Sequence, residues 1–144
     1  MRLAILLAVA LFATPAAAVD AAPMDAAAMR AAFYGATLDG EYSDGLAWSE
    51  TFSRSGRSVY AQEGARSAGR IAFRGPTICF VYEVGFDGGC FRVWRRSLNC
   101  FDFYGVDATD RPYATRQQQR AGTGWTARAW RTDAQSTCKA VPVG

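Results

Sequence analysis

Short stretches in which apolar and polar residues alternate fill the middle of the chain. They are rich in aromatic and β-branched residues, and turn clusters such as SDG, SRSG, GARSAG and GFDGG separate them. This pattern is typical of β-strands joined by tight turns. We expect seven strands between about residues 36 and 105, in the segments ATLDGEYS, LAWSETF, RSVYAQE, RIAFRG, TICFVYE, CFRVWRR and NCFDFYG.

These strands follow one another without helix-sized gaps. That order favours an antiparallel arrangement over one in which strands and helices alternate. So many short strands must close on themselves or stack in order to hide their edges. The pattern therefore predicts a mainly β fold, either a small antiparallel β-barrel or a strongly curved meander sheet.

One short helix is expected ahead of the strands, at about residues 24–34. Asp25 can cap its first turn, Met29 and Phe33 lie four residues apart on one face, and Gly35 can end it. The polar segment 106–124, by contrast, has no alternation and is expected to form a long loop. A last strand and a tail are expected over residues 125–144.

The first residues have the pattern of a secretory leader. Arg2 precedes an apolar run, and small residues at 16–18 fit a cleavage site, so residues 1–18 are predicted to be a signal peptide and the mature chain to begin near Val19. The apolar run is shorter than the roughly 20 residues of a membrane span. Residues 19–144 are therefore expected to form a single domain without a membrane anchor, in the periplasm or outside the cell.

The four cysteines are predicted to form disulfides. Exported proteins oxidise their cysteines in pairs, and the spacing here contains no two-residue knuckle of the kind that binds zinc. The favoured pairing joins Cys79 to Cys90 and Cys100 to Cys138, while the two other pairings remain open. A bend in GFDGG is expected to bring Cys79 and Cys90 together, because the predicted hairpin registers set no two cysteines opposite each other.

The alternation in CFRVW and CFDFY predicts how these two strands pair. With RRSLN as the connecting loop, Phe91 is expected opposite Phe103, and Val93 opposite Phe101, on a buried face. The same register sets Arg92 opposite Asp102 and Trp94 opposite Cys100 on the other face. As structure, that second face holds a cross-strand ion pair and a ring that covers a disulfide.

The same face is also a candidate binding surface, because arginine and large aromatic side chains are enriched at binding hot spots. Its members are Arg92, Trp94, Arg95, Arg96 and Tyr104, and Trp48 is a further aromatic candidate. A separate candidate is the group Glu41, Asp44 and Glu50 beside Trp48, because paired carboxylates next to an aromatic platform are used by glycosidases.

Composition limits the possible chemistry. The chain has no histidine, which removes Ser-His-Asp and Cys-His catalysis and the commonest ligand of catalytic zinc. We expect neither a metal nor a cofactor. Residues 111–139 carry six basic side chains against one acid, but the formal net charge of the whole chain is only +3. An ordinary solvated surface is therefore expected, with no nucleic-acid partner.

The order of motifs resembles a domain-of-unknown-function family of small secreted proteins from alphaproteobacteria. The matching positions cover about half the chain and are Gly35, Thr37, Gly40, Trp48, Glu50, Phe52, Cys79, Cys90, Asn99, Cys100, Phe103 and Tyr104. One departure is Gly69-Arg70-Ile71, where the family has G-x-W. The resemblance implies a periplasmic β-rich domain and carries over no catalytic residue.

Three classes of function follow from the sequence. The first is a periplasmic binding module that holds a small apolar ligand inside a barrel or presents its surface to a protein partner. The second is an inhibitor of a secreted peptidase or lysozyme that uses segment 106–124 as its inserting element. The third is a carboxylate-based hydrolase. Catalysis is the less expected of these roles.

Overall fold

The structure of the protein is a computed structural model that describes residues 21–138. The predicted signal peptide lies outside the described residues. The elements are, in chain order, β1 (Ala22–Pro23), α1 (Ala26–Phe33), β2 (Thr37–Tyr42), β3 (Ala47–Phe52), β4 (Arg57–Gln62), β5 (Ala65–Arg74), β6 (Thr77–Tyr82), β7 (Gly89–Ser97), β8 (Cys100–Gly105), α2 (Arg116–Ala121) and β9 (Ala127–Arg131).

Strands β2 to β9 close into an antiparallel barrel. Each strand from β2 to β7 pairs with the next, β8 pairs with β7 and β9, and β9 returns to β2. The short strand β1 adds to β7 beside Trp94 and Arg95, beyond the end of β6. Closure pairs the strand edges that an open sheet would leave exposed. The barrel expected from the sequence is thus confirmed.

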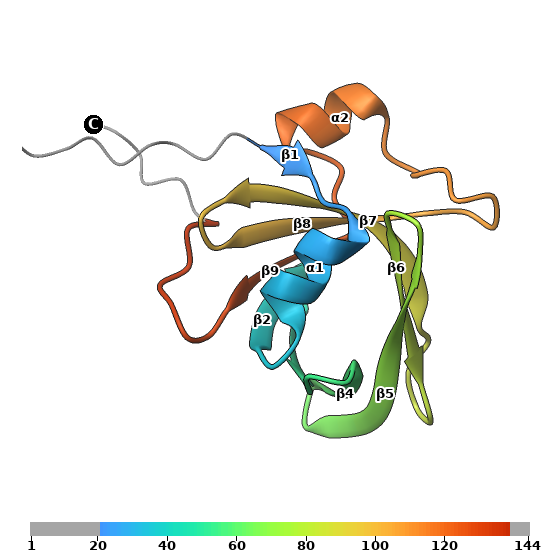
Figure 1. Ribbon diagram of the computed structural model, residues 1–144, viewed down its shortest axis with the longest axis vertical. Helices are drawn as coiled ribbons and strands as arrows, with labels where there is room; N and C mark the ends of the chain where they lie inside the picture. Colours follow the sequence, from blue (N-terminus) through green and yellow to red (C-terminus); the bar gives the residue numbers. More distant parts are fainter. Residues whose placement is uncertain (1–20, 139–144) are drawn as a thin grey trace, which may run out of the picture.

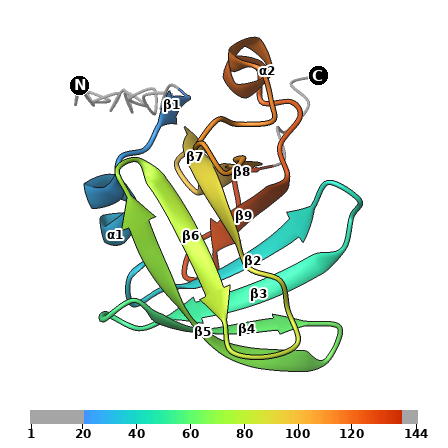
Figure 2. The ribbon, with the colours of Figure 1, turned by 90° about the vertical axis from the view of Figure 1, so that its right-hand side faces the viewer.

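Helix α1 closes one end of the barrel. Asp25 is its N-cap and accepts a hydrogen bond from the Ala28 backbone N–H at 2.8 Å, and Gly35 follows it with a φ of 73°. Figure 1 shows α1 in the middle of the ring of strands. Figure 2 shows α1 at one end and the β2–β3, β4–β5 and β6–β7 connections toward the other.

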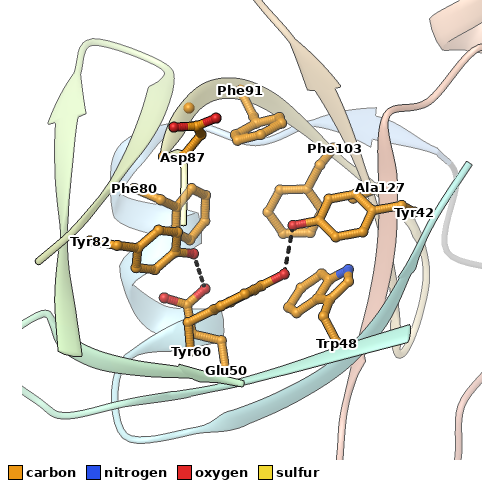
Figure 3. A pocket seen from close by; sticks show the side chains of 12 residues that line it. Tyr42, Trp48, Glu50, Tyr60, Phe80, Tyr82, Asp87, Phe91, Phe103 and Ala127 are labelled. Atoms are coloured by element: carbon orange, nitrogen blue, oxygen red, sulfur yellow. Dashed lines mark hydrogen bonds between the residues drawn. The ribbon is translucent and has the colours of Figure 1, made fainter. Parts of the chain in front are cut away.

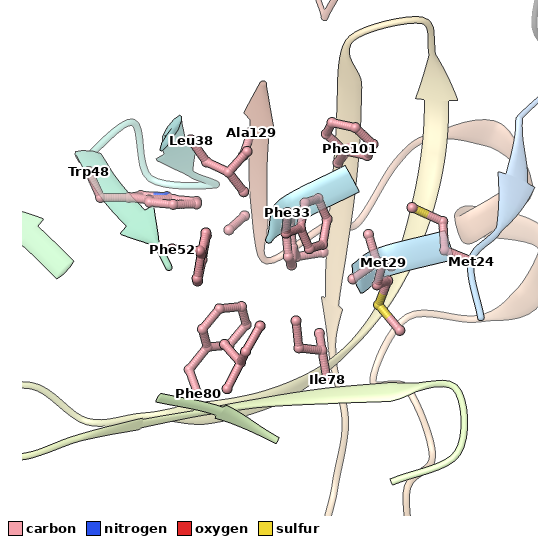
Figure 4. Close-up of a cluster of buried hydrophobic side chains, with 14 of the residues drawn as sticks. Met24, Met29, Phe33, Leu38, Trp48, Phe52, Ile78, Phe80, Phe101 and Ala129 are labelled. Atoms are coloured by element: carbon pink, nitrogen blue, oxygen red, sulfur yellow. The ribbon is translucent and has the colours of Figure 1, made fainter. Parts of the chain in front are cut away.

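Phe33 of α1 is at the centre of the hydrophobic core. Its ring packs edge-on against Phe101 at 5.2 Å between centroids and lies nearly parallel to Phe103 at 5.8 Å. Figure 4 shows Phe33 surrounded by side chains from opposite walls of the barrel, among them Phe52 and Ile78. The burial of a phenylalanine side chain contributes roughly 1.5–3 kcal/mol. The helix therefore fills one end of the barrel as part of its core.

Two expected boundaries are wrong. Only Gly64, the first residue of the cluster GARSAG, lies in a turn, because β5 already begins at Ala65 and pairs with the whole of β4. Segment 106–124 is not one long loop, because it contains α2. Thr115 and Gln118 form a capping box at the start of α2, and Gly122 ends it with a φ of 72°.

The β7–β8 register differs by two residues from the expected one. Val93 lies opposite Phe103 and Trp94 opposite Asp102, because β7 extends to Ser97 and leaves a short turn before Cys100. A bulge between Arg95 and Ser97 accounts for the irregular pairing there. A shift of two residues leaves each side chain on the same face of the sheet, so Phe101 and Phe103 are buried as expected.

The two disulfides are those favoured from the sequence, Cys79–Cys90 and Cys100–Cys138. The expected bend before Cys90 is not needed, since Cys79 and Cys90 are direct partners across β6 and β7. The second bridge spans 38 positions and ties the tail to the start of β8. Disulfides of this kind are typical of proteins in an oxidising environment.

Among residues 21–138, no helix combines the length and the apolar character that a membrane crossing requires.

Candidate functional site

Most of the surface predicted to bind a partner is covered by α2. Trp94 is buried, and its indole Nε1 donates to Oε1 of Gln119 on α2 at 3.0 Å. Arg96 donates to the backbone oxygens of Gln119 and Arg120, at 2.8 and 3.2 Å. These carbonyls lie in the last turn of α2, where a cation is favourable. The side chains therefore hold α2 against the outside of the barrel.

Asp102 is the centre of this contact. Its carboxylate has no exposed surface and accepts hydrogen bonds from Nε of Arg96 at 2.8 Å and from Nε of Arg128 at 2.6 Å. Arg96 also donates to the hydroxyl of Tyr104 at 3.0 Å. Burial raises the pKa of Tyr104 to about 12, and the charge of Asp102 acts in the same direction. The group formed by Arg96, Asp102 and Arg128 is called the Asp102 cluster below.

The remaining predicted binding residues lie apart. Arg92 reaches the backbone oxygen of Asp110 at 3.5 Å, and it does not pair with Asp102 as expected from the sequence. Arg95 is exposed and donates to the backbone oxygen of Leu98 at 3.1 Å. Trp48 points into the barrel. The structure thus brings together Trp94, Arg96 and Tyr104, and Arg92 shares with Trp94 the lining of a groove beside α2. Binding through this surface stays a prediction.

A pocket of about 160 Å³ lies inside the barrel, among the last residues of β2 and β6 and the first residues of β7, away from the end where α1 leads into β2. Figure 3 shows the aromatic side chains that surround it. The lining residues are Tyr42, Trp48, Glu50, Tyr60, Phe80, Tyr82, Asp87, Gly88, Gly89, Phe91, Phe103 and Ala127. They come from β2, β3, β4, β6, β7, β8, β9 and the β6–β7 connection, so barrel closure assembles the pocket.

The rings hold one another in place around this pocket. Tyr60 packs against Tyr82 with ring centroids 4.9 Å apart, and Trp48 lies roughly parallel to Tyr60 at 6.2 Å. The hydroxyls of Tyr42 and Tyr60 are 2.9 Å apart. The indole of Trp48 lies on Gly40, where a Cβ would come within 2.3 Å of the ring. Gly40 is therefore required for this position of Trp48.

Two buried polar atoms of the pocket lining have no hydrogen-bond partner among the described residues. They are Oε1 of Glu50 and Nε1 of Trp48. Glu50 is only 2 % exposed, and its other oxygen accepts a hydrogen bond from the hydroxyl of Tyr82 at 3.1 Å. Buried polar groups are nearly always satisfied, and an exception needs an explanation. Neither atom is open to the cavity, so a molecule in the pocket would reach them only after a shift of side chains, and the Ser58 hydroxyl beside Glu50 is the group that a small rotation would pair with it.

The environment changes the acidity of the polar groups. Burial raises the pKa of Glu50 to about 7, and the hydroxyls of Ser58 and Tyr82 oppose this shift only in part. Burial also raises the pKa of Tyr60 and of Tyr82, so both phenols keep their protons at neutral pH. Glu50 is therefore the titratable group of this pocket that changes charge near neutral pH.

The three carboxylates predicted as a group do not share this pocket. Glu50 lines it, but Glu41 and Asp44 do not, and Asp44 accepts a hydrogen bond from the Leu46 backbone N–H in an exposed turn. The second carboxylate of the pocket belongs to Asp87, which the sequence analysis did not consider. Within residues 21–138, no group of three or more His, Cys, Asp or Glu side chains is placed to hold a metal ion.

We predict that Glu50 makes stability fall as pH rises. A carboxyl whose pKa is higher in the folded chain stabilises the protein below its unfolded pKa, and this contribution is lost as pH rises through the folded pKa. For Glu50 the loss runs from about pH 4.5 to about pH 7 and amounts to about 3 kcal/mol. Urea unfolding at pH 5 and pH 8 should therefore show a smaller decrease for Glu50→Gln than for the natural chain. Parallel pH dependence in the two proteins would contradict this.

Fold and site together define a class, a small antiparallel β-barrel with a ligand-sized aromatic pocket inside it. Comparisons with protein-family models, curated proteins and solved structures found no match to this chain. The resemblance to secreted alphaproteobacterial proteins stays a hypothesis, and the function has to be argued from the geometry of the site.

Proposed function

We propose that this protein is an exported binding module of the periplasm that holds a small, largely apolar ligand inside its barrel. The pocket inside the barrel carries this proposal. It is lined by seven aromatic rings and by the carboxylates of Glu50 and Asp87. Apolar walls with a few placed polar groups are typical of small-molecule sites. A cavity of about 150 Å³ is enough for a benzene-sized molecule.

The cellular location is supported by separate observations. Residues 1–18 have the pattern of a secretory leader. The four cysteines form two disulfides, which persist in oxidising compartments. Together with the resemblance to secreted alphaproteobacterial proteins, these observations favour the periplasm as the place where the ligand is met.

Binding in the pocket is expected to change the environment of the Trp48 indole. Nuclear magnetic resonance can follow its N–H signal while aromatic probes of benzene size with a neutral, cationic or anionic substituent are added. The signal of Trp48 is assigned by its absence in Trp48→Phe. We expect at least one probe to shift it at millimolar concentration or below, because the Trp48 ring lines the pocket and a bound aromatic ring changes the magnetic environment of its neighbours.

A change that fills the pocket provides the control. Ala127 lines the pocket, so Ala127→Leu places additional side-chain volume in it and should abolish the shift. Ala72→Leu makes the same change at an exposed position of β5 and should leave binding unchanged. Equal binding by both variants, or no shift with any probe, would refute a ligand site in the barrel.

A second candidate function is inhibition of a secreted peptidase or lysozyme. The connection between β8 and α2 (orange in Figure 1) is supported by a compact turn, in which Asp107 accepts hydrogen bonds from the backbone N–H groups of Thr109 and Arg111. Tyr113 is 76 % exposed on this connection. A rigid loop that presents an exposed aromatic side chain is suited to enter an enzyme cleft. Inhibition assays against peptidases and lysozymes separate this function from ligand binding.

A further inference from the structure

The charges of the barrel pocket are opposite in sign to the net charge of the chain. Sixteen lysine and arginine residues against thirteen acids give the protein a formal net charge of +3, yet no lysine or arginine among residues 21–138 lines the pocket. The two charged residues that do so are the carboxylates of Glu50 and Asp87. Figure 3 shows them on opposite sides of the cavity. Such a site attracts cations and rejects anions.

The buried position of Glu50 indicates where a positive group of a ligand would bind. Glu50 is 2 % exposed, and its carboxyl group extends from β3 between the rings of Tyr60 and Tyr82. An ionised carboxylate in such a place is costly unless a cation pairs with it. A ligand with a positive group would supply the missing partner.

The aromatic walls fit the same kind of ligand. The face of an aromatic ring is negative, so cages of tyrosine and tryptophan bind ammonium groups, and desolvation strengthens the attraction. Trp48, Tyr60 and Tyr82 follow one another along the pocket wall, with neighbouring ring centroids 6.2 and 4.9 Å apart, and Tyr82 at one end of this row contacts the Glu50 carboxylate. At about 160 Å³, the pocket has room for one ring with a short amine side chain.

We propose that the barrel pocket binds a small organic cation, an ammonium group on a compact apolar body, with Glu50 as its counter-ion. This inference rests on the proposed ligand-binding function and names the class of ligand for that site. The apolar body fills the aromatic cavity, and the ammonium group lies next to the carboxylate of Glu50 and the neighbouring rings. Asp87 lines the pocket at an exposed position, and its carboxylate adds to the attraction for the ammonium group.

The groups that face Glu50 predict how binding depends on pH. Tyr82 donates a hydrogen bond to Glu50, and Tyr42, Tyr60 and Asp87 are the other titratable side chains that line the pocket. Since burial raises the pKa of the three phenols, they stay neutral, and Glu50 changes charge near pH 7. The affinity for an amine is therefore expected to fall from pH 8 to pH 5, whereas that for a neutral analogue stays constant.

Three probes of the same shape test the proposal. They are benzylamine, benzyl alcohol and benzoate, titrated by calorimetry and by the Trp48 indole signal at pH 8. Benzylamine should bind about tenfold or more tightly than benzyl alcohol, because the ammonium gains a charge-assisted hydrogen bond and contacts with ring faces. Benzoate should not bind measurably, since its charge would face Glu50 and Asp87.

Variants of single carboxylates complete the test. Glu50→Gln should remove the preference for benzylamine and keep the binding of benzyl alcohol. Glu83→Gln, an exposed carboxylate outside the pocket lining, is the matched control and should change neither. If Glu50→Gln fails to fold, Asp87→Asn at an exposed position should still reduce the preference.

The outcomes separate the two proposals. Benzyl alcohol that binds as tightly as benzylamine, or an amine preference that survives in Glu50→Gln, would overturn the cation site and leave a ligand-binding barrel. If none of the three probes binds or shifts the Trp48 signal, the proposed function fails with it.

Discussion

Replacement of Asp102 by asparagine should destabilise the protein by about 3–5 kcal/mol. Asp102 is fully buried and accepts hydrogen bonds from two arginines whose side chains are only 17 % and 18 % exposed. Asparagine has nearly the same shape but carries no charge, and its amide N–H₂ faces donors. Arg96 and Arg128 would then be left as nearly buried cations without a counter-ion, and this is the source of the cost.

The loss should be concentrated around α2. Arg96 donates both to Asp102 and to the last carbonyls of α2, so the helix depends on the position of this arginine. Urea unfolding measures the total effect, and amide hydrogen exchange should show that α2 loses protection before the barrel does.

Asp133→Asn is the control for this prediction. Asp133 pairs with Arg131 at the surface, where its side chain is 60 % exposed, and such pairs contribute at most about 1 kcal/mol. A loss in Asp102→Asn no larger than that in Asp133→Asn would show that the Asp102 cluster does not hold α2.

Removal of the Cys100–Cys138 disulfide should cost about 4 kcal/mol. The bridge spans 38 positions, and a closed loop of this length restricts the unfolded chain strongly. The double replacement Cys100→Ala with Cys138→Ala avoids leaving a hydroxyl in a fully buried position. Unfolding in urea measures the change, and the tail after β9 should exchange its amide hydrogens faster than the sheet does.

The second bridge serves as the comparison. Cys79 and Cys90 are separated by only 11 positions on paired strands, so their double replacement by alanine should cost about 3 kcal/mol, less than the first. The side chain of Asn99 also holds the tail, with a hydrogen bond to the backbone oxygen of Ala134 at 3.0 Å. A loss below about 1 kcal/mol for the Cys100–Cys138 pair would show that Asn99 and its neighbours are sufficient.

The sequence contained a signal for α2 that its polar character obscured. Thr115 and Gln118 have the spacing of a capping box, and Gly122 can end a helix. The helix has no apolar face, however, and Gln119 is its one buried residue. Hydrophobic periodicity therefore gave no indication of it, because hydrogen bonds and charge, rather than apolar burial, hold α2 against the barrel.

Part of the pocket could have been predicted as well. Alternation in WSETF puts Trp48, Glu50 and Phe52 on one face of β3, so a buried phenylalanine implies a buried glutamate beside it. The sequence analysis instead grouped Glu50 with Glu41 and Asp44, which are near it in the chain. Tyr82 and Asp87 reach the pocket from the other side of the barrel, and no local pattern connects them to Glu50.

The sequence by itself determined the β class of the fold, the short helix before the strands, the side on which each core phenylalanine lies and the oxidation of the cysteines in pairs. These properties follow from local alternation, capping residues and cysteine positions. Only the tertiary structure decided the β7–β8 register, since a shift of two residues leaves every side chain on the same face. It also decided where Glu50 and the Asp102 cluster find their partners, because closure of the barrel and docking of α2 bring together residues that are distant in the chain.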